Sequence, residues 1–153
     1  MVEDQAQWRL CLKAHLLAGV ASGVAGLASK YEFTVDADPA HPEVWYLSAS
    51  AQPNLLRGEF SPPAHNEWQA KSHIYRSVGG ATWEQLSGGL PEPLDYMAFA
   101  LVTDLTTPGH LYAGLSNGDV WHTLDYGDTW IRLPFNMGAI RQLIIMDMRD
   151  WSK

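Results

Sequence analysis

Short apolar runs, each bounded by Gly, Pro, Asn, Asp or Ser, recur through most of the chain. Those of the second half are Met97–Thr103, His110–Leu115, Asp119–Leu124 and Thr129–Leu133. Four similar runs precede them, at Tyr31–Val35, Val44–Ser48, His73–Ser77 and Thr82–Leu86. Short apolar runs between turn formers are typical of antiparallel strands. The pattern therefore predicts two sets of four strands.

The two sets are copies of one repeat. Three matches share a spacing of 66 residues: Asp38, Pro42 and Tyr46 correspond to Asp104, Pro108 and Tyr112. Three later matches share a spacing of 47 residues: Gly80, Thr82 and Trp83 correspond to Gly127, Thr129 and Trp130. The first copy must therefore hold 19 extra residues, the difference between these spacings. We place them in an inserted loop at 51–70, which is rich in Pro and polar residues and lacks periodicity.

Four strands per repeat is the pattern of a β-propeller blade. We therefore expect an all-β fold, a partial β-propeller of two four-stranded antiparallel blades at 31–87 and 88–134. A C-terminal strand and tail are predicted for 135–153, with the strand at Ile140–Met146. The side chains expected in the core between the blades are Tyr46, Trp83, Leu86, Phe99, Leu101, Tyr112, Trp130 and Leu133.

The first 30 residues lack the strand pattern. Arg9 and Lys13 precede a weakly apolar stretch, 16–28, that ends in small residues, and this order fits a short signal peptide. A helical or irregular segment, or a degenerate strand region of a preceding blade, is the interpretation that we favour. The stretch is too short and too polar to cross a bilayer.

Composition narrows the classes of partner. The formal net charge is −7 and Lys and Arg form no run, so we expect no nucleic-acid binding. The single cysteine, Cys11, cannot form an intramolecular disulfide, which favours the cytoplasm and leaves secretion open. The six histidines show no metal-site spacing, so we expect no metal and no cofactor.

The second copy contains a turn motif. Residues 123–130 match the pattern Ser/Thr-Xaa-Asp-Xaa-Gly-Xaa-Thr-Trp at every defined position, with Thr123, Asp125, Gly127, Thr129 and Trp130. We expect Asp125 and Thr129 to bind backbone amides of the turn, and Gly127 to take an unusual backbone angle.

The first copy keeps only part of this motif. The same alignment places Arg76 at the Ser/Thr position and Val78 at the Asp position, while Gly80, Thr82 and Trp83 are retained. We expect the turn and its packing anchor to survive there without the side-chain clasp.

This motif resembles the Asp-box, or BNR, repeat of a β-propeller family that includes sialidases, xyloglucanases, sortilin-type receptors and photosystem II assembly factors. The resemblance covers about residues 31–147 and is most specific between Gly109 and Leu133. It implies a structural motif that lies away from the ligand-binding face. The Arg-Ile-Pro motif of the sialidases does not occur in the sequence.

Catalytic chemistry finds little support in the sequence. Gly114–Gly118 fits the serine-hydrolase pattern Gly-Xaa-Ser-Xaa-Gly, but a strand rather than a helix follows it, which indicates a hairpin turn. Glycoside hydrolases need two facing carboxylates, for which the loops offer Glu59, Glu67, Glu92 and Asp95. Nothing distinguishes these acids from ordinary solvated ones. We therefore assign no catalytic residue.

The inserted loop and the connection between the blades combine flat aromatic side chains with polar ones, a composition suited to sugar or peptide recognition. The candidate ligand-binding residues are Arg57, Glu59, His65, Asn66, Trp68 and Tyr96, although Trp68 could instead pin the loop to the blade. We expect a non-catalytic scaffold or binding module for a glycan or protein partner. The alternative is a fragment of a glycoside hydrolase. Exposed blade edges also favour self-association.

Overall fold

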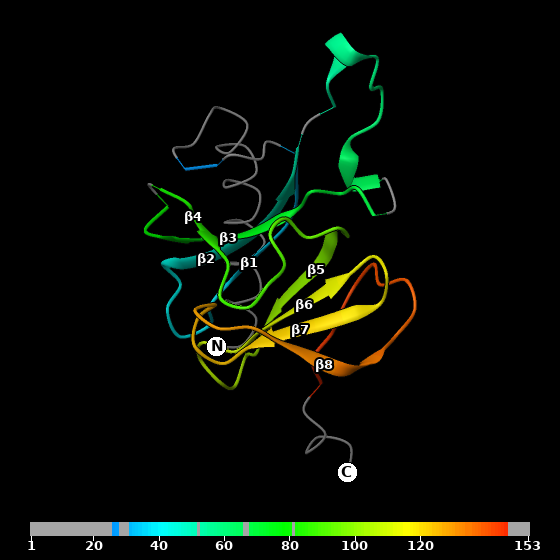
Figure 1. Ribbon diagram of the computed structural model, residues 1–153. Coiled ribbons are helices and arrows are strands. Elements are labelled where there is room, and N and C mark those ends of the chain that lie inside the picture. The colour runs from blue at the N-terminus through cyan, green and yellow to red at the C-terminus, as the bar shows by residue number, and fades with distance from the viewer. Residues whose placement is uncertain (1–25, 28–30, 52, 66–67, 81, 147–153) are drawn as a thin grey trace.

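The computed structural model describes residues 26–27, 31–51, 53–65, 68–80 and 82–146. Over this part, the chain forms two antiparallel four-stranded sheets, each ordered as in the sequence (Figure 1). The first contains β1 (Tyr31–Ala37), β2 (Val44–Ser50), β3 (His73–Val78) and β4 (Glu84–Leu86). The second contains β5 (Ala98–Thr103), β6 (Leu111–Leu115), β7 (Asp119–Thr123) and β8 (Ile131–Asn136). The all-β prediction with two sets of four strands is confirmed.

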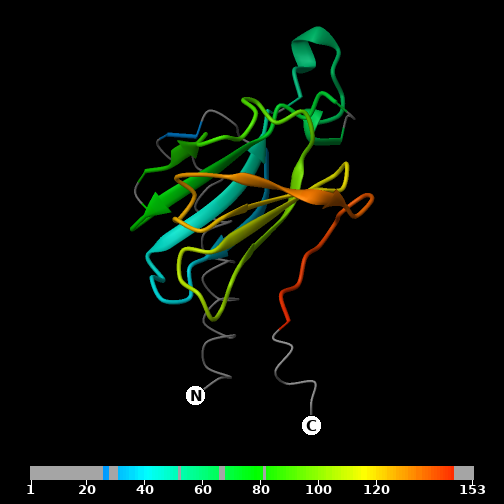
Figure 2. The same ribbon diagram turned by 60° about the horizontal axis from the view of Figure 1, so that its bottom comes forward.

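The inserted loop leaves the body of the molecule between β2 and β3. It contains two short 3-10 turns, η1 (Leu55–Arg57) and η2 (Pro63–His65), and it projects beyond the end of the first sheet (Figures 1 and 2). The corresponding connection in the second sheet is the short turn between β6 and β7. Both connections lie at the same end of the sheets, because each follows the second strand of its repeat.

The two sheets stack in a head-to-tail manner. The core between them contains Leu111 and Trp130, whereas their counterparts Trp45 and Trp83 lie in a separate cluster on the far side of the first sheet. Neighbouring residues of a strand point to opposite faces, and Tyr46 accordingly points into the core between the sheets. Equivalent side chains of the two repeats therefore point in the same direction.

The opposite faces obey the same rule. Tyr46 and Leu86 of the first sheet pack against the second sheet, whereas their counterparts Tyr112 and Leu133 lie on the far face of the second sheet. A two-fold sandwich would bring equivalent faces together instead. One face of the first sheet thus packs against the opposite face of the second. The two sheets are related by a repeated step along the stack and not by a two-fold axis between them.

The connection between the sheets repeats as well. Gly89 has a φ of +100°, and a Cβ there would lie 2.8 Å from the Trp130 carbonyl oxygen. Gly26 has a φ of +93°, and a Cβ there would lie even closer to the Trp83 carbonyl oxygen. Leu90 follows Gly89 into the core between the sheets, and Leu27 follows Gly26 onto the far-side cluster. In both repeats, therefore, a Gly lies close to the backbone of the buried Trp and the Leu that follows it packs into an apolar cluster.

Polar contacts also join the sheets along β1 and β5. The buried Asp36 carboxylate accepts hydrogen bonds from the Thr103 amide at 2.9 Å and the Thr103 hydroxyl at 3.0 Å. Asp38 accepts a hydrogen bond from the Gly109 amide at 2.8 Å, and Ser48 donates one to the Ala98 carbonyl at 2.7 Å. The buried side chains of Asp36, Asp38 and Ser48 are thereby hydrogen-bonded across the junction.

The prediction of the core between the blades is wrong in part. Of the eight expected core side chains, four lie in the core between the sheets: Tyr46, Leu86, Leu101 and Trp130. The other four lie in three further clusters: Trp83, Phe99, Tyr112 and Leu133. Head-to-tail stacking explains Trp83, Tyr112 and Leu133, because it sends one member of each equivalent pair to another face.

The predicted strand over Ile140–Met146 is wrong. This segment has no strand conformation. Ile140 is buried against Ala100 and Val120 on the far face of the second sheet, with Leu143 beside it. Gly114 makes room for both side chains, since a Cβ there would lie 2.7 Å from Ile140. The apolar residues Ile140 and Leu143 therefore pack against the far face of the second sheet and do not add a strand to it.

The predictions for residues 1–30 concern a segment that, apart from 26–27, lies outside the described residues. The part of the chain that the structure describes contains no helix with the length and apolarity needed to cross a bilayer.

Candidate functional site

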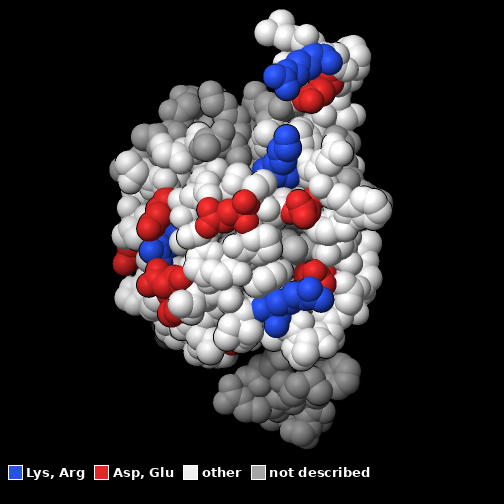
Figure 3. Space-filling view, viewed as in Figure 1, with Lys and Arg blue, Asp and Glu red and all other residues white. Residues whose placement is uncertain are grey.

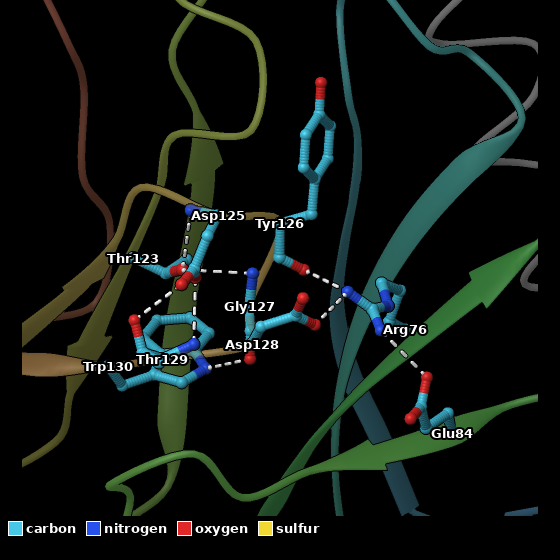
Figure 4. Close-up of polar contacts among 9 residues, drawn as sticks. All are labelled: Arg76, Glu84, Thr123, Asp125, Tyr126, Gly127, Asp128, Thr129 and Trp130. Atoms are coloured by element: carbon cyan, nitrogen blue, oxygen red, sulfur yellow. Dashed lines mark hydrogen bonds and ion pairs between the residues drawn. The ribbon is translucent and has the colours of Figure 1, made fainter.

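The turn between β7 and β8 is held by the Asp125 side chain (Figure 4). Its carboxylate accepts hydrogen bonds from the Thr129 amide at 2.8 Å, the Thr129 hydroxyl at 2.6 Å and the Thr123 hydroxyl at 2.7 Å. Thr123 Oγ1 accepts a hydrogen bond from the Gly127 amide at 3.0 Å, and the Trp130 indole nitrogen donates one to the Gly127 carbonyl at 3.0 Å. One carboxylate therefore closes the whole turn.

These hydrogen bonds change the acidity of Asp125. Donation by the Thr129 hydroxyl and amide, and then by Thr123, lowers the pKa of the Asp125 carboxyl to about 2. The charged form is therefore the one that the turn stabilises. Gly127 supplies the required backbone angle, with a φ of +96°.

The equivalent turn between β3 and β4 lacks this clasp. Strand register shows that Ser77 takes the place of Thr123, because Ser77 pairs with Trp45 as Thr123 pairs with Leu111. The alignment that put Arg76 at this position is wrong by one residue. The first turn is one residue shorter than the second, so the spacing counted from Trp83 cannot be carried back into β3.

Without a carboxylate in this turn, the Ser77 hydroxyl lacks the acceptor that Thr123 has in the second turn. Its hydroxyl is buried and has no hydrogen-bond partner among the described residues. Two residues further on, where Asp125 stands in the second repeat, the first has Gly79. Thr82 likewise makes no side-chain hydrogen bond within the described part of the chain.

Arg76 links the two turns instead. Its guanidinium donates to the Tyr126 carbonyl at 3.0 Å and to the Asp128 carboxylate at 2.7 Å, and its other nitrogen donates to Glu84 at 3.0 Å (Figure 4). Partial burial lowers the pKa of Arg76, but the pairs with Asp128 and Glu84 outweigh it and leave the pKa raised. The first sheet is therefore tied to the motif of the second.

A hollow of about 310 Å³ lies at the opposite end of the sheets from this motif. It opens between the base of the inserted loop, the start of β5, the β6–β7 turn and the segment after β8. The lining residues are Ala64, His65, Trp68, Tyr96, Phe99, Ser116, Asn117, Ala139 and Arg141. Its volume is at the lower end of the range for small-ligand sites.

The structure brings together three of the six candidate ligand-binding residues. His65, Trp68 and Tyr96 line the hollow. Trp68 is 67% exposed, so its ring does not pin the loop; the buried Ala64 and Ala70 at the loop base do so. Arg57 and Glu59 lie at the exposed tip of the loop, away from the hollow. Asn66 lies outside the described residues.

Sequence reasoning missed the wall formed by Arg141. Its guanidinium lies 4.5 Å from the centroid of the Phe99 ring, and it forms no ion pair with a carboxylate of the described residues. No periodic signal could place Arg141, because the segment after β8 is irregular. Asn117 could have been found, since the β6–β7 turn is the repeat counterpart of the inserted loop.

The candidate catalytic carboxylates that the structure describes lie away from the hollow. Glu59 accepts the Asn54 amide at 2.9 Å inside the loop tip, and Glu92 lies 3.4 Å from the amide nitrogen of Gln85. Neither of them lines the hollow, nor does Asp95, while Glu67 lies outside the described residues.

The remaining motif is a turn. Ser116-Asn117-Gly118 connects β6 to β7, with the Gly118 amide bonded to the Leu115 carbonyl at 3.0 Å, as the hairpin interpretation predicts. Within the described ranges, no three His, Cys, Asp or Glu side chains gather in a way that could hold a metal ion. Comparison of the chain with protein families and with curated proteins gives no match.

Proposed function

We propose that the chain forms two consecutive blades of an Asp-box β-propeller and acts as a non-catalytic module that binds a glycan in the hollow. The head-to-tail stacking of the two sheets, in which one face of the first repeat meets the opposite face of the second, supports the first part, because successive blades around one axis repeat by a constant step. The Asp125 turn and the hollow lie at opposite ends of the sheets, which agrees with the structural role that the resemblance implies.

The lining of the hollow carries the second part. Sugars present flat C–H faces and a rim of hydroxyls, and such faces pack on exposed aromatic rings. Trp68 offers an exposed ring, while Asn117 and Arg141 offer donors for hydroxyl oxygens. A few polar groups placed around an aromatic surface are typical of a small-ligand site.

Binding is favoured over hydrolysis by the absence of acids. No Asp or Glu of the described residues lines the hollow. Glycoside hydrolysis by the usual route needs a pair of carboxylates on either side of the bond. A glycoside hydrolase fragment is therefore the second candidate, and a protein partner is an outcome of the test.

The test is a glycan array, followed by calorimetric titration of the glycans it selects. We expect the Trp68→Ala variant to bind about tenfold or more weakly, because aromatic anchors dominate such sites. The Arg57→Ala variant is the matched control, since Arg57 lies in the same loop away from the hollow, and its affinity should not change. Turnover of chromogenic glycosides that is lost on Glu92→Gln or Asp95→Asn would instead establish the hydrolase. Selective binding of peptides would overturn the glycan assignment.

A further inference from the structure

The tip of the inserted loop carries three exposed apolar side chains. Leu55 is 68% exposed, Leu56 is fully exposed and Phe60 is 87% exposed. Figure 3 shows uncharged atoms at the extremity of the projection, with basic and acidic atoms just beneath them. The sequence places Arg57 and Glu59 between these apolar residues. The tip is therefore an apolar knob above a charged collar.

This knob is a folded structure. The Asn54 carbonyl accepts the Arg57 amide at 3.0 Å and the Glu59 amide at 3.1 Å, while Glu59 accepts the Asn54 amide at 2.9 Å. Gly58 closes the turn with a φ of +77°, and its amide donates a hydrogen bond to the Leu55 carbonyl at 3.1 Å. The backbone bonds hold the apolar side chains outward, since the turn is closed without them.

The base of the loop is fixed to the sheets. Ala64 and Ala70 are buried in one cluster with Met97 and Phe99, and the Ser50 hydroxyl donates to the Ala70 carbonyl. The second sheet makes the same connection with a short turn, so the sheets do not require the insertion. An anchored base and an ordered tip present the knob away from the body of the molecule (Figure 2).

We propose that this knob inserts into the interfacial layer of a zwitterionic lipid bilayer. Leu and Phe beside a cationic side chain are typical of interfacial membrane segments. A convex tip suits a fluid surface, which needs no matching groove. Three side chains cannot supply the roughly 800 Å² that each partner contributes to a standard protein interface.

Charge selects the type of lipid. The chain carries a formal net charge of −7, which repels an anionic surface. At the tip, Glu59 offsets Arg57, so apolar contact drives the insertion and the Arg57 guanidinium can reach a lipid phosphate. This interaction lies on the membrane surface and is independent of glycan binding in the hollow.

The test is flotation of the full chain with phosphatidylcholine vesicles. We expect the wild-type chain to float with the vesicles at both low and high salt. Leu56→Ser and Phe60→Ser should each reduce the partition coefficient by about tenfold or more, the factor for one buried apolar side chain. Both sites are exposed, so thermal unfolding should be unchanged.

Leu105→Ser is the matched control, because Leu105 is 66% exposed in a different loop, and this variant should float like the wild type. Equal flotation of all variants, or no flotation of the wild type, would overturn the proposal. Flotation confined to anionic vesicles at low salt would also overturn it. A lipid-free mass that falls to that of a monomer in Leu56→Ser would identify a second copy as the occupant of the knob instead.

Discussion

The two equivalent turns of the repeats solve the same problem in different ways. In the second repeat, Asp125 and Thr123 satisfy the turn locally, with one carboxylate accepting three hydrogen bonds. In the first repeat, Ser77 occupies the place of Thr123 and its buried hydroxyl has no partner in the described structure. Arg76 then connects the weaker turn to the stronger one through Tyr126 and Asp128.

The difference shows what the motif contributes. Both turns keep a buried Trp, Trp83 in the first repeat and Trp130 in the second, so burial of the ring does not depend on the carboxylate. What depends on it is the satisfaction of polar groups within the turn. We infer that the motif stabilises its own turn locally. The turn of the first repeat lacks the motif and is stabilised by the contacts of Arg76 with the second turn.

The largest effect is expected for Asp125→Ala. The variant leaves the amide and hydroxyl of Thr129 and the hydroxyl of Thr123 without their common acceptor. We expect the free energy of unfolding to fall by about 2 kcal/mol, in the range for hydrogen bonds to a charged group. Urea denaturation measures this change. A loss as small as that of the control variant Asp95→Ala would contradict the clasp.

A smaller loss is expected for Arg76→Met. Methionine keeps much of the apolar stem and removes the links to Tyr126, Asp128 and Glu84. Since both carboxylates are largely exposed, we expect a loss of about 1 kcal/mol. A double-mutant cycle with Asp128→Ala separates the link between the sheets from the pair with Glu84. Strict additivity in this cycle would show that the ion pair between Arg76 and Asp128 contributes no coupling energy.

The pH dependence of stability sharpens the comparison further. The pKa of Asp125 is about 2 in the folded chain and about 4 when unfolded, so the unfolded state binds the proton more readily. The stabilisation is complete above pH ~4 and is lost as the pH falls towards ~2. Asp125→Asn should therefore show a flatter fall in melting temperature over this window. Parallel curves for the wild type and the variant would contradict the assigned pKa.

The smallest effect is expected for Ser77→Ala. The substitution removes a buried hydroxyl that has no partner, so we expect stability to stay within about 0.5 kcal/mol of the wild type or to rise. Thr123→Val is the matched change in the second turn and should cost about 1 kcal/mol or more. Thermal unfolding of the two variants side by side makes the comparison. An equal loss at both positions would remove the distinction between the turns.

The strands could be predicted from sequence because their apolar runs lie between turn formers. The side-chain faces could not be assigned, since alternation shows that Tyr46 and Trp45 face opposite ways but not which one meets the second sheet. The register of the first turn failed because a deletion lies between Ser77 and Trp83, where no residue marks it.

The candidate site was predictable only where it lies on the inserted loop. Trp68 and His65 stand out there by composition, and Tyr96 stands out in the connection between the sheets. Arg141 comes from a segment whose apolar pattern imitates a strand, and only the packing of Ile140 against the second sheet brings it to the hollow. Tertiary packing, and not local pattern, decides such positions.

The order of strands in each sheet has a consequence for how the chain folds. Each strand pairs with its immediate neighbour in the sequence, so all ladder contacts of the first sheet close before β5 is needed. Local pairings of this kind form quickly, because little loop entropy is lost before they are made. On the ribosome, the first sheet can therefore complete its ladder while the second is still being synthesised. The second sheet then forms against the face of a first sheet whose strands are already paired. The contacts of Arg76 with Tyr126 and Asp128 form last, when the second sheet packs against the first.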